Sequence, residues 1–196
     1  MSTLPLGKLT KIRMGVTLRG RDATRPDPQG SHRMIQIGDL ADDGTFRSDD
    51  FCRVEPRETI KESFYLQPGD ILFPNRGLRT TASVFNGNDP RTFVGAQFYV
   101  IRVNASSDLL PEYLAWLLRT SAASKYFASH RKGTLVKTLQ LGDLQSFPVC
   151  LPALDLQHRI IEIDQLQREA QQLESTLYSL RHTHLELSLL KAAEQP

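Results

Sequence analysis

The pattern of apolar and polar positions is most regular in the last quarter of the chain. Positions separated by alternating steps of three and four form one series from residue 163 onward: Ile163, Leu166, Ala170, Leu173, Leu177, Leu180, His184 and Leu187. Apart from His184 these residues are apolar, as expected for the a and d positions of a coiled coil. The series predicts one long helix from Asp155 to Lys191, which is about 55 Å long at about 1.5 Å per residue.

Such a narrow apolar seam needs a partner, because an isolated helix has nothing against which to bury it. We therefore predict that this helix pairs with another helix through the apolar members of the series, Ile163, Leu166, Leu173, Leu177, Leu180 and Leu187. The alternative is an ordinary core helix of a compact domain, although the predicted length exceeds the usual three to four turns.

The patterns before residue 152 are shorter and mix strands with helix. Apolar, β-branched and aromatic runs predict strands at 34–37, 51–54, 71–73, 82–85, 93–103 and 149–151. Asn86-Gly87 is a turn signal suited to a hairpin, and Pro111 begins a predicted helix that reaches about residue 127. We expect an α+β fold, with a mixed globular domain at 1–152 followed by a helical spacer or dimerisation region at 153–196.

Composition limits the class of protein. Of 196 residues, 40% are hydrophobic and 23% are charged, which suits one globular domain of about 150 residues with a helical extension. The sequence has neither a run of about 18 apolar residues nor the pattern of a signal peptide, so we expect a cytoplasmic protein. Cys52 and Cys150 are expected to be reduced and packed as small apolar residues, without a metal site.

The formal net charge of +2 hides a segregation of charge along the chain. Residues 1–33 have seven Lys and Arg against two Asp, and residues 111–137 have five Lys and Arg against one Glu. Residues 34–62 and 138–196 are each net −4. If the fold brings the two basic segments together, one face can bind phosphates. The alternative is a solvated surface whose charges are balanced by nearby acids.

Four short motifs follow one another along the chain. They are Leu6-Gly7-Lys8-Leu9 with Gly15-Val16-Thr17; Ile35-Gln36-Ile37-Gly38-Asp39-Leu40; Leu66-Gln67-Pro68-Gly69-Asp70-Ile71-Leu72-Phe73; and Gly133-Thr134 with 144–152 and Leu156-Gln157-His158-Arg159-Ile160. In this order they resemble half of the DNA specificity subunit (S, HsdS) of type I restriction-modification systems. Leu156 and Ala153 depart from that family's Glu and second proline. A full subunit has two target-recognition domains and two spacer helices, so the resemblance implies a half-length form that pairs with itself.

The resemblance also implies a function. The chain would be a non-catalytic subunit that recognises double-stranded DNA for a methyltransferase (M) subunit and a restriction (R) subunit. S-adenosylmethionine and ATP would then belong to these partners, with no cofactor in this chain. Two copies related by a two-fold axis would read a bipartite, palindromic site, whose half-sites are spaced in helical turns of about 34 Å. The competing hypothesis is a coiled-coil assembly protein without sequence-specific DNA contact.

Three segments are candidates for DNA contact. Their residues are Arg19, Arg21 and Arg25 in the first; Asn75, Arg76 and Arg79 in the second; and Lys132, Thr134 and Lys137 in the third. Arg suits guanine or phosphate and Asn suits adenine, whereas the third segment suits phosphates. The alternatives are, in turn, a disordered loop, a hairpin tip and a charged helix end. Gly69 and Asp70 are expected to be structural, because the turn needs glycine and the carboxylate can accept backbone N–H groups.

The sequence contains no recognisable catalytic motif. It lacks a phosphate-binding G-x-x-x-x-G-K-[ST] loop, and it lacks the glycine-rich turn and Asn/Asp-Pro-Pro-aromatic motif of methyltransferases. The histidines do not have the spacing of metal ligands. We therefore expect a protein that is not an enzyme.

Overall fold

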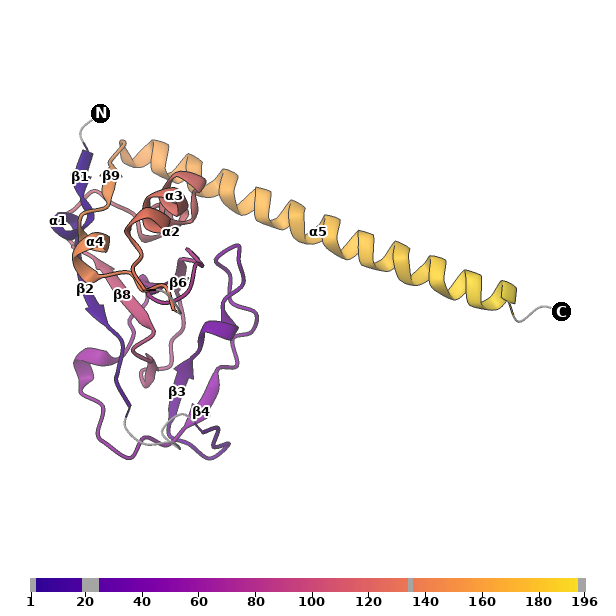
Figure 1. Cartoon of the computed structure of the whole chain (residues 1–196), viewed down its shortest axis with the longest axis horizontal. Coiled ribbons are helices and arrows are strands. Elements are labelled where there is room, and N and C mark those ends of the chain that lie inside the picture. The colour runs from indigo at the N-terminus through magenta and orange to yellow at the C-terminus, as the bar shows by residue number, and fades with distance from the viewer. Residues whose placement is uncertain (1–2, 19–24, 134–135, 194–196) are drawn as a thin grey trace. The chain divides into compact units, whose positions relative to one another are not determined.

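The computed structural model describes residues 3–18, 25–133 and 136–193 (Figure 1). The chain divides into two compact units, one ending at Gln157 and the other beginning at His158. We call the first unit the body. It contains the described strands and short helices, whereas the second unit consists of most of helix α5 (Leu154–Ala193). The predicted fold class, a mixed α+β domain followed by a long C-terminal helix, is confirmed.

The described strands form three sheets, with strand orders β2-β8-β5-β6, β4-β3-β7 and β1-β9. Neighbouring strands are antiparallel except for β3 and β7, which are parallel. The strands are β1 (Thr3–Pro5), β2 (Thr10–Met14), β3 (His32–Ile35), β4 (Cys52–Val54), β5 (Asp70–Pro74), β6 (Ser83–Phe85), β7 (Thr92–Val94), β8 (Phe98–Val103) and β9 (Pro148–Cys150). The short helices are α1 (Leu6–Leu9), α2 (Pro111–Arg119), α3 (Ser121–His130) and α4 (Leu141–Gln145), with 3-10 turns η1 (Ile37–Asp39) and η2 (Glu62–Phe64).

The four-stranded sheet contributes side chains to the core from both of its faces. One face shares an apolar core with β3 and β7; its members are Ile35, Leu40, Phe51, Leu66, Leu72, Phe85, Val94, Phe98 and Val100. Successive strand residues point to opposite faces, so Phe73 lies on the other face, where its ring centroid is 5.1 Å from that of Phe127 in α3. Burial on both faces explains why β5 is a continuous apolar run rather than an alternating one.

Two predicted elements are each divided in the structure. The expected strand 93–103 is two strands, β7 and β8, which belong to different sheets because the chain turns at residues 95–97. The expected helix 111–127 is α2 and α3. It is divided at Thr120, whose backbone is extended (ψ 155°) and whose hydroxyl accepts a hydrogen bond from the backbone N–H of Ala123 (3.3 Å).

The predicted hairpin at Asn86-Gly87 is wrong. β6 pairs with β5, whereas β7 pairs with β3, so the two strands on either side of this turn lie in different sheets. The sequence also gave no indication of β1, β2, α1 or α4. Each has three to five residues, which is too short for a periodic pattern to be recognised.

The turn before β5 has the structure expected of the Gly69-Asp70 motif. Gly69 has a positive φ of 87°, which favours glycine. The Asp70 carboxylate accepts a hydrogen bond from the backbone N–H of Gln67 (2.9 Å). The prediction that both residues are structural is therefore confirmed, and the same carboxylate also pairs with Arg102 (2.7 Å), a partner that the sequence did not indicate.

Gln157, in the first turn of α5, holds the start of α2 in place. Its side chain is fully buried. The side-chain oxygen accepts a hydrogen bond from the Leu110 N–H (2.9 Å), and the side-chain NH2 donates to the carbonyl oxygens of Asp108 (2.7 Å) and Pro152 (2.9 Å). One amide thus satisfies three backbone groups. One of them is the N–H of Leu110, which directly precedes α2 and has no partner within that helix.

We expect Gln157→Ala to lower the free energy of unfolding by about 2–4 kcal/mol, since a buried polar group left without a partner costs about 1–3 kcal/mol. Denaturant unfolding of the full chain measures this change. Gln165→Ala, at an exposed position of the same helix, is the matched control and should change stability by less than about 0.5 kcal/mol. Equal stability of the two variants would contradict the role given to Gln157.

Candidate nucleic-acid interface

The second and third predicted basic segments lie side by side on the body. The backbone N–H of Gly77 donates to the carbonyl oxygen of Lys137 (2.9 Å). Thr138 forms antiparallel bridges with both Arg76 and Lys132. The side chains of Arg76, Lys132 and Lys137 are exposed, and we call the surface that these three residues form the basic loop surface. Loops separated by more than 50 residues in sequence therefore present their cations together.

Arg131 fixes one segment against the other from inside the body. Its side chain is buried, and its guanidinium donates to the carbonyl oxygens of Gly77 and Arg79 (2.7 Å to the latter). Burial lowers the pKa of this guanidinium. The chain then turns at Gly133, where φ is +112° and a Cβ atom would lie 2.4 Å from the carbonyl oxygen of Val136. Only glycine fits at this position, directly after Lys132.

Asn75 and Arg79, both predicted as DNA contacts, form contacts within the body. Asn75 is 2% exposed, and its side-chain NH2 donates to the carbonyl oxygen of Ala96 (2.8 Å). Arg79 forms an ion pair with Asp42 (2.8 Å) and donates to the carbonyl oxygen of Leu40 (2.8 Å). These contacts correct the prediction for Asn75, whose amide lies inside the fold. The side chain of Arg79 is 35% exposed, and its contact with DNA stays a prediction.

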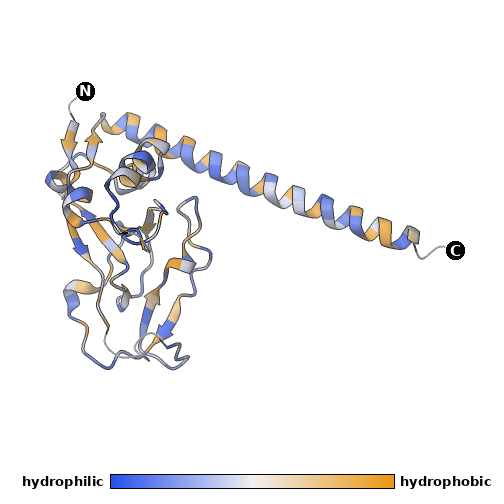
Figure 2. Cartoon of the chain, viewed as in Figure 1, coloured by the Kyte–Doolittle hydropathy of each residue, from blue (hydrophilic) through white to orange (hydrophobic). Residues whose placement is uncertain are grey.

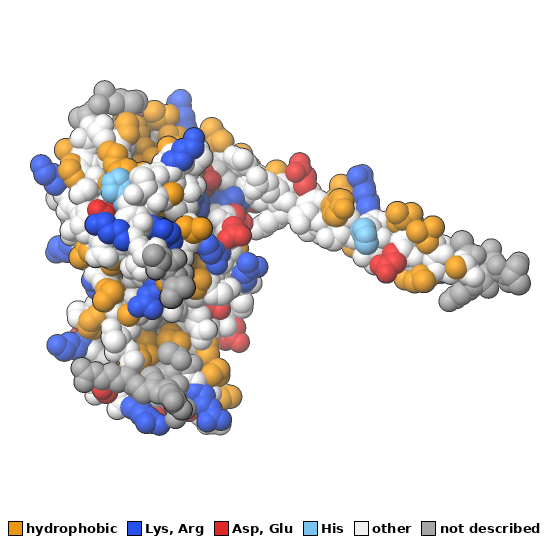
Figure 3. Space-filling view, in the orientation of Figure 1, with side chains coloured by type: hydrophobic (Ala, Val, Ile, Leu, Met, Phe, Trp, Pro, Cys, Tyr) orange, Lys and Arg blue, Asp and Glu red, His pale blue; other side chains and the backbone are white. Residues whose placement is uncertain are grey.

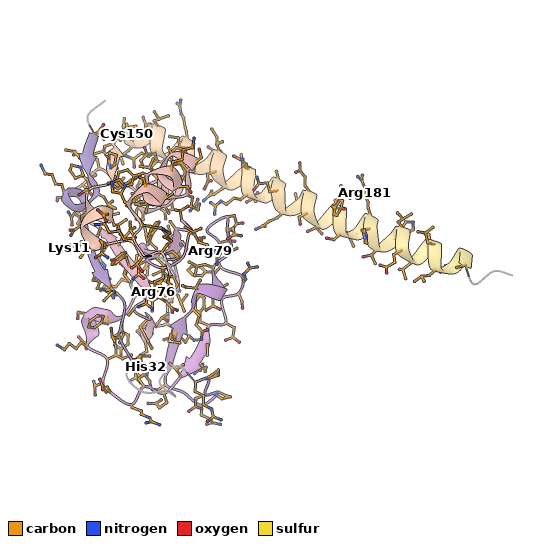
Figure 4. The ribbon with its side chains drawn as sticks, viewed as in Figure 1. Lys11, His32, Arg76, Arg79, Cys150 and Arg181 are labelled. Atoms are coloured by element: carbon orange, nitrogen blue, oxygen red, sulfur yellow. The ribbon has the colours of Figure 1, made fainter. Side chains whose placement is uncertain are left out.

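The described ends of the first predicted segment lie beside the same surface. Its residues Arg19 and Arg21, like Thr134 of the third segment, lie outside the described residues; Arg25 is described and is exposed. Thr17, Leu18 and Pro26, on the two sides of this loop, line a pocket of about 460 Å³ together with Arg76. In Figure 4, Arg76 lies in the middle of the body. The ends of the first segment are thus next to one cation of the basic loop surface.

The turn between β7 and β8 adds Gln97, a residue that no pattern in the sequence had indicated. Gln97 is partly exposed and lines the same pocket as Arg76. The amide of Gln is suited to paired hydrogen bonds with adenine. The turn itself depends on Gly15, because a Cβ there would lie 2.2 Å from the carbonyl oxygen of Gly95. A glycine inside the apolar run 93–103 was the signal available in the sequence, but the run was assigned to one strand.

Helix α5 carries the second predicted surface. It has 40 residues and is therefore about 60 Å long at about 1.5 Å per residue. Apolar and polar residues alternate along it (Figure 2). All six predicted seam residues are exposed by 48–71%: Ile163, Leu166, Leu173, Leu177, Leu180 and Leu187. A row of exposed apolar side chains at this spacing is what the predicted association with another helix requires, and that association stays a prediction.

Two kinds of site were sought among the described residues, a metal site and a membrane-spanning helix. Within them, no group of three or more His, Cys, Asp and Glu side chains is placed to hold a metal ion. No helix among them is both long enough and apolar enough to cross a bilayer. Lys and Arg side chains are distributed over the visible face of the body, with fewer acidic side chains between them (Figure 3).

Comparison with protein families gives one match over most of the chain. The family described as "type I restriction modification DNA specificity domain" matches residues 25–179. This range includes the basic loop surface and most of the α5 seam. A comparison with curated proteins gives no match.

Solved structures show the same fold. The chain is similar to the HsdS subunit from Thermoanaerobacter tengcongensis (TM-score 0.61, 20% identity, 89% of this chain and 39% of that chain). It is also similar to the S subunit of a type I restriction-modification system from M. genitalium (TM-score 0.59, 12% identity, 93% and 42%). A third similar chain comes from a study of complex assembly and conformational transition of the type I R-M system (TM-score 0.66, 21% identity, 98% and 44%). This chain therefore spans less than half the length of each of them.

Proposed function

Because the chain belongs to the family of type I restriction-modification DNA specificity domains, we propose that it is a non-catalytic subunit that recognises a specific DNA sequence. The observation that carries this proposal is the pairing of the second and third basic segments. It gathers Arg76, Lys132 and Lys137 beside the pocket that contains Gln97. Cations bind the phosphates and set the register of the protein on the duplex, while Arg and Gln can read base edges.

The division of roles follows from the side chains. Lys132 and Lys137 are exposed lysines on a turn, so they act as point charges for phosphates. Arg76 and Gln97, which line one pocket, have planar groups suited to paired hydrogen bonds with guanine and adenine. Arg25 and the predicted Arg19 and Arg21 extend the same contact along the duplex.

We further propose that the chain works as a half-subunit. The chain covers 39–44% of the S subunits that it resembles, and one body with one long helix corresponds to half of such an architecture. Two copies joined through the α5 seam would present two bodies to a bipartite, palindromic site. A methyltransferase subunit, with S-adenosylmethionine, would supply the chemistry, and an ATP-dependent restriction subunit would complete the system.

Comparison of methylated positions in the host genome with and without this chain tests the function directly. We expect methylation at one interrupted, palindromic sequence to disappear when the chain is deleted and to return when it is restored. Binding of duplex DNA should also fall steeply as salt rises, since bound phosphates release counterions. An unchanged methylation pattern together with no DNA binding at low salt would favour the competing function, a coiled-coil assembly protein.

Replacement of Arg76 separates base reading from phosphate binding. If Arg76 pairs with guanine, Arg76→Ala should weaken binding to the target by about 1–3 kcal/mol and relax the preference at one base position. Competition binding with duplexes that differ at single positions measures both effects. Arg47→Ala, which removes an exposed arginine from the acidic segment, is the control and should leave the preference intact. Equal losses on every duplex would assign Arg76 to a phosphate instead.

A further inference from the structure

A second basic site lies at the edge of the four-stranded sheet, away from the residues assigned above. Lys11 and Arg13 of β2 are paired in register with Arg102 and Val100 of β8, so all four side chains point to the same face of the sheet. Together with Ser63 of η2 they line a pocket of about 200 Å³. None of these residues lines the pocket that contains Arg76. Figure 4 labels Lys11 at the margin of the body and Arg76 in its middle.

The pocket has an excess of positive charge. Asp70 is the one acid that the described contacts place against these cations, and Arg102 pairs with it through Nε and Nη2 (2.7 Å each). One carboxylate therefore faces three cations, Lys11, Arg13 and Arg102, and the group keeps a net positive charge. Arg13 is partly buried, and burial lowers its pKa, with the nearby charge of Arg102 acting in the same direction and that of Asp70 against it. An anion between Lys11 and Arg13 would reduce this repulsion.

Arg13 is held at the pocket by contacts with residues 64 and 65 and has one N–H group without a partner in the described part of the chain. Its Nη2 donates to the carbonyl oxygens of Phe64 (3.0 Å) and Tyr65 (3.3 Å), and its guanidinium lies 5.5 Å from the centre of the Phe64 ring. Its Nη1 is buried and has no hydrogen-bond partner among the described residues. A buried N–H group without a partner is unfavourable, so a small rotation of the side chain that brings Nη1 to an acceptor in the pocket would stabilise the site.

We propose that this pocket binds a phosphate group, with Lys11 and Arg13 as charged donors and the Ser63 hydroxyl as a neutral one. The volume accommodates a single tetrahedral oxyanion rather than an extended ligand. A net charge of about two positive units and a hydroxyl fit a group that has several acceptor oxygens and up to two negative charges. A carboxylate would offer fewer oxygens and half the charge.

Titration of the full chain with inorganic phosphate, by calorimetry in a buffer without other oxyanions, tests the site. We expect saturable binding of one phosphate per chain, about ten-fold weaker in Lys11→Ala, as for the loss of one charge-assisted hydrogen bond. Lys8→Ala, an exposed lysine in the neighbouring helix α1, is the matched control and should bind as the wild type does. Absence of saturable binding, an equal loss in both variants, or equally tight binding of acetate would overturn the proposal.

The phosphate can come from a DNA backbone or from a small phosphorylated molecule, and DNA binding by the same variants separates the two. For a DNA phosphate, Lys11→Ala should weaken binding equally on every duplex and reduce the salt dependence by about one counterion. For a small molecule, Lys11→Ala should lose phosphate binding while its DNA affinity stays that of the wild type. Since the phosphate titration contains no DNA, its failure would be distinct from a failure of the proposed function.

Discussion

Arg102→Ala is expected to lower the free energy of unfolding of the body by about 3–5 kcal/mol, because it leaves a buried carboxylate without its charged partner. Asp70 is 0% exposed, and Arg102 donates two hydrogen bonds of 2.7 Å to it. These bonds are the main reason that the pKa of Arg102 is raised. After the substitution, the backbone N–H of Gln67 (2.9 Å) would be the described donor that remains to the carboxylate. Denaturant unfolding of the full chain measures the loss.

The reciprocal substitution should cost less. The side chain of Arg102 is 39% exposed whereas that of Asp70 is 0% exposed, so an arginine that loses Asp70 can turn its charge toward water. We expect Asp70→Asn to destabilise by about 1–2 kcal/mol less than Arg102→Ala. The double variant with leucine at both positions should recover most of the loss, because no buried charge remains. Equal costs for the two single variants would mean that water reaches the carboxylate, contrary to its burial.

The sequence predicted two kinds of feature: elements with a long periodic pattern of apolar residues, and turns whose contacts lie within a few residues. Helix α5 was recognised because its seam repeats over many turns, and each repeat adds to the same signal. The structural role of Asp70 was predicted correctly because it depends on near neighbours. These are Gly69 and the backbone N–H of Gln67, which donates a hydrogen bond to the carboxylate. Its pairing with Arg102 was not predictable in the same way, since those residues are 32 positions apart and meet only through the register of β5 and β8.

The candidate interface shows the same difference between what residue type predicts and what only the tertiary structure determines. Residue type alone pointed to Arg76, Lys132 and Lys137, but only the tertiary hydrogen bonds between the two loops bring them to one surface. Residue type was misleading for Asn75, which had every property of a base-reading residue in the sequence. The structure instead uses its amide to hold the turn at Ala96. A polar residue in a basic loop can form hydrogen bonds within the protein rather than with DNA, and only its burial in the structure distinguishes the two roles.

Self-association through α5 is expected to be abolished by glutamate at both Leu173 and Leu177. Their side chains are 71% and 48% exposed in the single chain. Covering a leucine contributes roughly 1.5–3 kcal/mol, and in a symmetric pair each substitution counts twice. The two changes should therefore weaken the pair by at least about four orders of magnitude. Sedimentation of the full chain over a range of concentrations measures this, and helix content by circular dichroism verifies that α5 still forms.

Charge alone must be distinguished from loss of the seam. Gln171→Glu combined with Ser179→Glu adds the same two charges at exposed positions of α5 that belong to neither the a nor the d series. This control should associate as the wild type does. The added surface charges should weaken the pair only slightly, and less so at high salt. A leucine-to-glutamate variant that sediments like the wild type would rule out the seam as the joining surface. Methylation would then need another arrangement of two bodies, because a single half-site cannot specify an interrupted palindrome.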